Sequence, residues 1–173
     1  MDPIRSFFTF HRLTAFAFCL YLLTSCMKQE EYPPEPVIGL AGYASLYDTG
    51  SYAKYGILAI SFTDGDGDIG LSAGDTLPPF QKSGDYYYNM VISYFEKQHG
   101  EFVEVKLDPP FSARIPLLNP DYPGKAIKGT IWDTLTLNPK PVFDTIKLEV
   151  YIYDRALHKS NVVTTPEIIL RRN

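Results

Sequence analysis

Apolar and polar side chains alternate with a period of two near the C-terminal end of the chain. Residues 146–153 read Ile-Lys-Leu-Glu-Val-Tyr-Ile-Tyr, and the same period recurs at 90–95 and at 102–107. Alternate residues of a β-strand point to opposite faces of a sheet, so this period predicts strands with one buried face. The 13 Tyr and 11 Phe of the 173-residue chain agree, since aromatic residues favour strands. No segment predicts a helix of three turns.

Turn-forming residues separate the predicted strands. Beyond the three segments above, we expect strands near residues 39–47, 57–63, 112–118, 126–137 and 162–171, with prolines in the gaps between them. About eight short strands divided by turns are typical of an antiparallel sandwich. A body of this length can bury about two-thirds of its unfolded surface, which is enough for a core without cross-links. The sequence therefore predicts one all-β domain at 37–173.

The end of the chain resembles a known kind of module. Residues 153–161, Tyr-Asp-Arg-Ala-Leu-His-Lys-Ser-Asn, are similar to the last hairpin of immunoglobulin-like and fibronectin-III-like modules of extracellular bacterial proteins. In those modules an Asp-led turn and a Ser-Asn step lead into a final strand, expected here at 162–170. The resemblance implies an antiparallel immunoglobulin-like β-sandwich of about 7–8 strands, and it specifies a fold rather than a function.

The first 25 residues are predicted to be a secretory signal peptide. Arg5 and Arg12 precede an apolar run at residues 13–23, and small residues follow it. As a helix this run would rise only about 16 Å, whereas the hydrocarbon core of a membrane is about 30 Å thick. A transmembrane span is therefore not expected here, and the segment at 1–25 would be removed from the mature protein.

Residues 23–26 read Leu-Thr-Ser-Cys, which resembles the lipobox of bacterial lipoproteins. The resemblance implies cleavage before Cys26 and lipidation of that cysteine, with acyl chains such as palmitate. Two or three acyl chains on one residue give stable attachment to a membrane. Cleavage would also remove Cys19, so the mature chain would keep a single, modified cysteine and could form no disulfide.

A short polar segment, 26–36, is predicted to tether the domain to the lipid. Its prolines at positions 33, 34 and 36 favour a stiff, extended chain. Residues 27–31, Met-Lys-Gln-Glu-Glu, resemble the acidic export signal of surface lipoproteins of the Bacteroidota. Met27 is also not the Asp that retains a lipoprotein at the inner membrane. We expect an outer-membrane lipoprotein that faces outward, with the periplasmic face of the same membrane as the alternative.

The most distinctive motif follows the strand expected at 57–63. Residues 64–70 read Asp-Gly-Asp-Gly-Asp-Ile-Gly and resemble calcium loops of the D-x-D-x-D type. Clustered carboxylates repel one another, and a hard divalent cation with oxygen ligands removes that repulsion. The same glycines match G-x-G-x-x-G, but three carboxylates would repel a pyrophosphate, and the Gly- and Pro-containing segment 71–80 cannot form the helix that motif requires.

The expected ligands of this loop are Asp64, Asp66 and Asp68, with Asp75 folding back from the same loop and Asp154 as a distant donor from a neighbouring turn. If the residues are numbered as in the calcium loop of an EF-hand, Asp64, Asp66 and Asp68 fall at positions 1, 3 and 5, and Asp75 falls at position 12. Position 6 is Ile69 rather than Gly and flanking helices are missing, so the motif is not an EF-hand. The alternative is a solvated Asp-Gly turn without metal.

Aromatic residues suggest a second kind of site. The run Tyr86–Tyr88 and the lone Trp132 are side chains on which a sugar ring can stack. Packing is the competing interpretation, because alternation turns at least one of the three tyrosines inward and a Trp within a strand usually packs. We expect Trp132 to be packed.

The sequence indicates a binding protein more strongly than an enzyme. A net charge of −4 and a pI near 5.3 argue against nucleic-acid binding, and neither a G-x-S-x-G elbow nor a P-loop occurs. We expect a non-catalytic binding or accessory module at the cell surface, stabilised by calcium, with a glycan or an envelope protein as its partner. The alternatives are a small carboxylate-dependent glycoside hydrolase, which needs a cleft with two convergent carboxylates, and a structural subunit of an envelope complex.

Overall fold

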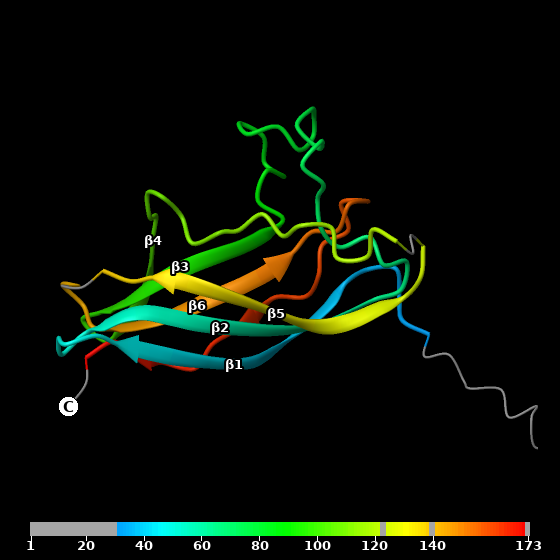
Figure 1. Cartoon of the computed structure of the whole chain (residues 1–173). Helices are drawn as coiled ribbons and strands as arrows, with labels where there is room; N and C mark the ends of the chain where they lie inside the picture. Colours follow the sequence, from blue (N-terminus) through cyan, green and yellow to red (C-terminus); the bar gives the residue numbers. More distant parts are fainter. Residues whose placement is uncertain (1–30, 122–123, 139–140, 172–173) are drawn as a thin grey trace, which may run out of the picture. The chain divides into compact units, whose positions relative to one another are not determined.

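The computed structural model describes residues 31–121, 124–138 and 141–171, and all regular structure in them is β (Figure 1). The predicted signal peptide, Cys26 and the first part of the tether lie outside these residues. The strands are β1 (Val37–Tyr47), β2 (Ala53–Asp64), β3 (Met90–Gln98), β4 (Glu101–Val105), β5 (Ile127–Thr136), β6 (Thr145–Ile152), β7 (Val163–Thr164) and β8 (Ile168–Ile169).

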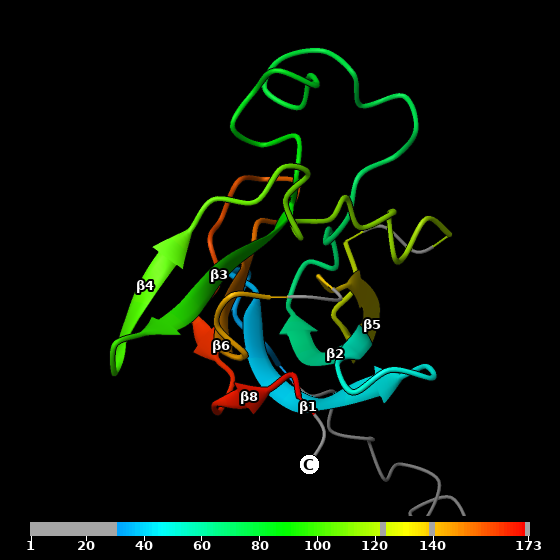
Figure 2. The ribbon, with the colours of Figure 1, turned by 90° about the vertical axis from the view of Figure 1, so that its left-hand side faces the viewer.

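These strands form two antiparallel sheets that face each other (Figure 2). One sheet has three strands in the order β1-β2-β5; the other has five, with the order β4-β3-β6-β7 and β8 also paired to β6. The prediction of an all-β antiparallel sandwich is confirmed.

The alternation seen in the sequence produces the core between the sheets. Ile146, Leu148, Val150 and Ile152 of β6 are fully buried, while the residues between them are partly exposed. On the facing sheet, the even-numbered residues of β2 from Leu58 onward supply the opposite layer. A period of two therefore places one face of each strand in the core.

Two strand predictions are wrong in detail. Segment 112–118 forms only isolated bridges at Ala113 and Pro116, because a proline has no N–H to donate to a ladder. The segment predicted at 162–171 is divided into β7 and β8, and Pro166 lies in the gap for the same reason. Both segments still border the core, since Ile115 and Ile168 are buried.

Between β2 and β3 the chain leaves the sandwich as a long irregular loop (Figures 1 and 2). Arg114, next to the residue that bridges Met90 of β3, holds this loop. Its guanidinium donates to four backbone carbonyls, those of Ser72 (3.4 Å), Asp75 (2.6 Å), Phe80 (3.5 Å) and Tyr87 (3.1 Å). Bonds to a charged donor are stronger than neutral ones, so one side chain organises much of the loop.

Asn89 fixes the point at which this loop returns to β3. Its side-chain carbonyl accepts the N–H of Ile115 at 2.6 Å, and its amide donates to the carbonyl of Ile115 at 3.2 Å. Only 2% of Asn89 is exposed. A buried backbone needs partners for its polar groups, and here an amide side chain bonds both groups of Ile115, whose carbonyl also accepts the N–H of Leu71 at 2.9 Å.

Candidate metal centre and open cleft

The alternation of β2 carries a carboxylate into the end of the core. Leu58, Ile60 and Phe62 face inward, and Asp64 is the next residue on that face, with none of its surface exposed. Its Oδ2 accepts the N–H of Ile69 at 3.2 Å. Its Oδ1 is buried and has no hydrogen-bond partner among the described residues. Such a group is costly unless something else satisfies it.

The glycines of the loop turn two further carboxylates toward Asp64. Gly67 has a φ of +68°, in the left-handed region, and a Cβ there would lie 2.0 Å from the carbonyl oxygen of Lys125. One carboxylate oxygen from each of Asp64, Asp66 and Asp68 lies within 4.8 Å of the other two. The Oδ1 atoms of all three are buried without a partner among the described residues. The structure thus brings together three of the five predicted ligands.

Burial and mutual repulsion oppose the charge of this group, which we call the Asp cluster (Asp64, Asp66 and Asp68). Burial, and then the charge of Asp66, raise the pKa of Asp64 to about 7. Burial raises the pKa of Asp68 as well, and the charge of Asp154 adds to that shift. Loss of solvent and nearby like charge both favour the neutral acid. A divalent cation would remove both penalties.

Asp154 lies beside the Asp cluster but is held by a neighbour. Its carboxylate accepts the backbone N–H of His158 at 2.7 Å and pairs with the imidazole Nδ1 at 2.8 Å. Burial raises the pKa of Asp154, and the bonds from His158 act against that shift. The same turn reaches Asp68, whose Oδ2 accepts the N–H of Ala156 at 3.0 Å. The predicted proximity of the two turns is present, although both oxygens of Asp154 already have partners.

Asp75 is not brought into the Asp cluster. Its two carboxylate oxygens form a bidentate ion pair with Arg155 at 2.5 and 2.8 Å, and one of them also accepts the N–H and hydroxyl of Ser72. Burial would raise the pKa of Asp75, but the bonds from Ser72 and Arg155 together lower it. This carboxylate connects the loop to the turn that contains Asp154.

The loop that contains the Asp cluster also contacts the tether, which the sequence did not indicate. Gly65 donates its N–H to the carbonyl of Pro33 at 2.8 Å. A Cβ on Gly65 would lie 2.3 Å from the carbonyl oxygen of Tyr32. The residue between the first two carboxylates must therefore be glycine for the tether to approach so closely.

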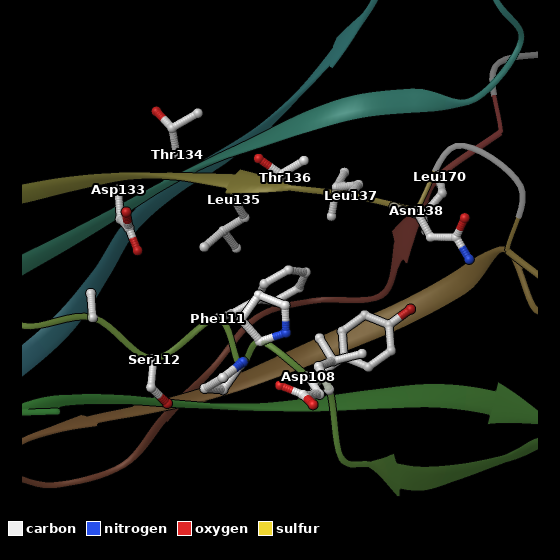
Figure 3. A pocket seen from close by; sticks show the side chains of 15 residues that line it. Asp108, Phe111, Ser112, Asp133, Thr134, Leu135, Thr136, Leu137, Asn138 and Leu170 are labelled. Atoms are coloured by element: carbon white, nitrogen blue, oxygen red, sulfur yellow. The ribbon is translucent and has the colours of Figure 1, made fainter. Parts of the chain in front are cut away.

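A second candidate site is a cleft of about 530 Å³ on the open side of the sandwich (Figure 3). β5 forms one wall, and the segment from Leu107 to Ala113 lies in the other. Asp133 and Leu135 point into the cleft, whereas Thr134 and Thr136 point away from it. Burial raises the pKa of Asp133. Sequence reasoning missed this carboxylate, although it shares the apolar side of β5 with Leu135.

The aromatic residues are arranged differently from the prediction. Trp132 is 70% exposed rather than packed. Side chains alternate along β5, and since Leu135 faces the core, Trp132 lies on the outer face of the strand. In register beside it lies Ala59 of β2, a small residue. The three tyrosines at 86–88 are half-buried instead, and Tyr87 packs against Tyr88 at 4.9 Å between ring centroids.

Comparison with protein-family models, with curated proteins and with solved structures found no match. Within the described part of the chain, no helix is long and apolar enough to cross a membrane.

Proposed function

We propose that the protein is a calcium-stabilised, non-catalytic binding module, carried on the outer membrane by lipid attached to Cys26 and facing outward. The single observation that supports it most strongly is the Asp cluster itself: each of its three carboxylates has one oxygen within 4.8 Å of the other two, and each has a buried Oδ1 without a partner among the described residues. Calcium takes six to eight oxygen ligands, including monodentate carboxylates, and tolerates irregular geometry. The Asp cluster would supply three of them, with other donors completing the shell.

Calcium in this place would act on stability rather than on chemistry. The Asp cluster lies where β2 ends, the tether passes and the turn of Asp154 begins. A cation that neutralises the cluster would hold these three segments together, since each bonds a residue of the same short loop. The role follows from the general rule that a ligand of the folded state alone stabilises that state.

Adding calcium should therefore raise the melting temperature of the full-length protein in detergent. With a dissociation constant near 0.1 mM, as is usual for weaker extracellular sites, 1 mM calcium adds about 1.4 kcal/mol. For a domain of this size the shift is about 3–5 °C. The Asp66→Ala variant should lose the shift and still fold, because it removes a repelling charge together with a ligand.

The matched control is Asp85→Ala, which removes an exposed carboxylate from the same long loop and should keep the full shift. A melting temperature that responds neither to EDTA nor to millimolar calcium would leave the motif as a solvated Asp-Gly turn. If the calcium-dependent shift in melting temperature persists in Asp66→Ala, the cation binds at another site.

The lipid anchor has its own test. Cells grown with labelled palmitate should incorporate label into the wild-type protein and not into Cys26→Ser, because the thiol and the new amino terminus of Cys26 accept the acyl chains. Cys19→Ser is the matched control and should label normally, since Cys19 lies inside the segment expected to be cleaved. Label and membrane association that survive in Cys26→Ser would contradict the proposal.

One observation favours a second candidate, a carboxylate-dependent hydrolase. Asp133 lines the cleft with a raised pKa, and Asp108 lines the same cleft (Figure 3). A buried acid beside a more solvated one is the arrangement that glycoside hydrolysis uses. Release of nitrophenol from a panel of nitrophenyl glycosides that is lost in Asp133→Asn would support this candidate. The binding module predicts no turnover by either protein.

A further inference from the structure

The two sheets of the sandwich are unequal. The sheet that contains β5 has three strands, while the facing sheet has five. β5 is the last strand on its side, and the cleft opens between it and the segment from Leu107 to Ala113 (Figure 3). That segment borders the facing sheet through the bridge between Ala113 and Met90. The cleft therefore lies along the side where the smaller sheet ends at β5.

The outer edge of β5 carries backbone groups without a partner strand. Leu137 donates its N–H to the carbonyl of Lys54 at 3.0 Å, and β5 continues in register with β2 from there. In an antiparallel pair, alternate residues bond the neighbouring strand, so the odd-numbered residues of β5 bond β2. The N–H and C=O groups of Thr130, Trp132 and Thr134 thus point away from β2, and the backbone of Thr134 also hydrogen-bonds the carboxylate of Asp133. No backbone partner for these three residues occurs in the part of the chain that the structure describes.

The cleft beneath this edge is suited to side chains from an added strand. Its apolar lining comes from both sheets and from the last residues of the domain: Tyr94, Leu107, Phe111, Leu135, Leu137 and Leu170. Leu135 points into it from β5, and so does the carboxylate of Asp133. A strand next to β5 would direct every second side chain into this space, because strand neighbours share their inward and outward faces.

We propose that an extended segment of a partner polypeptide adds to the outer edge of β5 as a fourth strand, with apolar side chains in the cleft and a basic side chain facing Asp133. The inference rests on the proposed binding function and names the class of its partner. The exposed backbone groups recur every second residue, about 6.8 Å apart along the strand. Another extended backbone reproduces that spacing of donors and acceptors, which is how peptides bind to sheet edges.

Charge selects among extended partners. Asp133 points into the cleft and Asp108 lies in its wall, and the chain as a whole carries a net charge of −4. A segment that alternates apolar with polar residues and carries Lys or Arg would satisfy these carboxylates. A second copy of this chain would bring its own Asp133 to the same edge, so like charges disfavour self-pairing.

Fluorescence anisotropy with the full-length protein in detergent tests the inference. The probes are labelled nine-residue peptides that alternate Thr with Val or Leu and carry Lys, Gln or Glu at the central apolar position. We expect the Lys peptides to bind and the Glu peptides to bind at least about tenfold more weakly. Methylation of the amide nitrogens on the edge that faces β5 should abolish binding, because it removes the donors of the shared ladder.

Two variants locate the site. Thr134→Pro removes an outward N–H, a change that an edge strand tolerates, and should weaken binding about tenfold. Asp133→Lys should reverse the preference from Lys to Glu peptides, which a merely unfolded variant could not do. Leu46→Thr is the control, because Leu46 is an exposed residue of β1 at the other edge of the same sheet, and it should bind within twofold of wild type.

Three results would overturn the proposal. The first is that no peptide binds, and the second is that binding survives both Thr134→Pro and amide methylation. The third is self-association that Thr134→Pro abolishes, which would mean that a second copy of the chain pairs with the edge of β5. None of these measurements involves calcium or the lipid. The peptide-binding test can therefore fail while the calcium and palmitate tests succeed, and it can succeed while they fail.

Discussion

Replacing Gly70 by alanine should lower the free energy of unfolding by roughly 3–4 kcal/mol and the melting temperature by about 10–14 °C. Gly70 has a φ of +109°, which L residues rarely adopt, and a Cβ there would lie 2.2 Å from the carbonyl oxygen of Pro116. Backbone bonds on both sides prevent relief, since Leu71 donates to Ile115 and Leu118 donates to Ile69. Thermal and urea unfolding would measure the loss.

Gly74→Ala is the matched control within the same long loop. Its added Cβ would find only the hydroxyl of Ser72, at 3.7 Å, and its φ lies outside the left-handed region. We expect a change of less than about 0.5 kcal/mol. If Gly70→Ala unfolds within about 2 °C of this control, the close packing of the loop against residues 115–118 is not as described.

The second large effect is expected for Asn89→Leu. Leucine has a similar size but cannot replace either hydrogen bond to Ile115. The variant leaves the backbone N–H of Ile115 unsatisfied at a residue that is 4% exposed, whereas the carbonyl of Ile115 keeps the N–H of Leu71 as a partner. An unsatisfied buried N–H costs about 1–3 kcal/mol and the lost bond to the carbonyl about 1 kcal/mol, so we expect a loss of roughly 3 kcal/mol. Denaturant unfolding would measure it.

Asn161→Leu is the matched control, because it removes the same number of hydrogen bonds from an asparagine that is exposed rather than buried. Asn161 makes the same pair of bonds to the backbone of Ile38, at 2.8 and 2.9 Å, but is itself exposed. Although Ile38 is only 5% exposed, these two bonds are part-buried because Asn161 is exposed, so water reaches them more easily than the bonds of Asn89 and the variant should lose about 1 kcal/mol or less. Equal losses in the two variants would mean that the buried position of Asn89 contributes nothing.

The strands could be predicted because side-chain periodicity is a local property. The segment at 146–153 alternates without exception, and the structure buries its apolar residues in that order. The same reasoning failed where one residue overrides a pattern. Pro166 interrupts an apolar segment that otherwise indicates a strand, and Pro116 limits its own segment to an isolated bridge.

The candidate sites were only partly predictable, since they depend on contacts between distant residues. The spacing of Asp64, Asp66 and Asp68 indicated a cluster, and Gly-rich curvature is enough to form one. Asp75 was assigned to it by counting along the chain, whereas Arg155, far away in sequence, pairs with it instead. Ordinary packing preferences would also bury Trp132 and expose Asp133. The structure exposes the first and turns the second inward, and such reversals are expected at functional sites.

The bond between Gly65 and Pro33 determines where mechanical force would enter the domain. Six residues lie between Cys26 and Pro33, and the seven steps from one Cα to the next reach at most about 25 Å in an extended chain. With lipid on Cys26, tension from the membrane would arrive first at the loop of the Asp cluster and only then at β1. Calcium bound there would stiffen the part of the domain that bears this tension first.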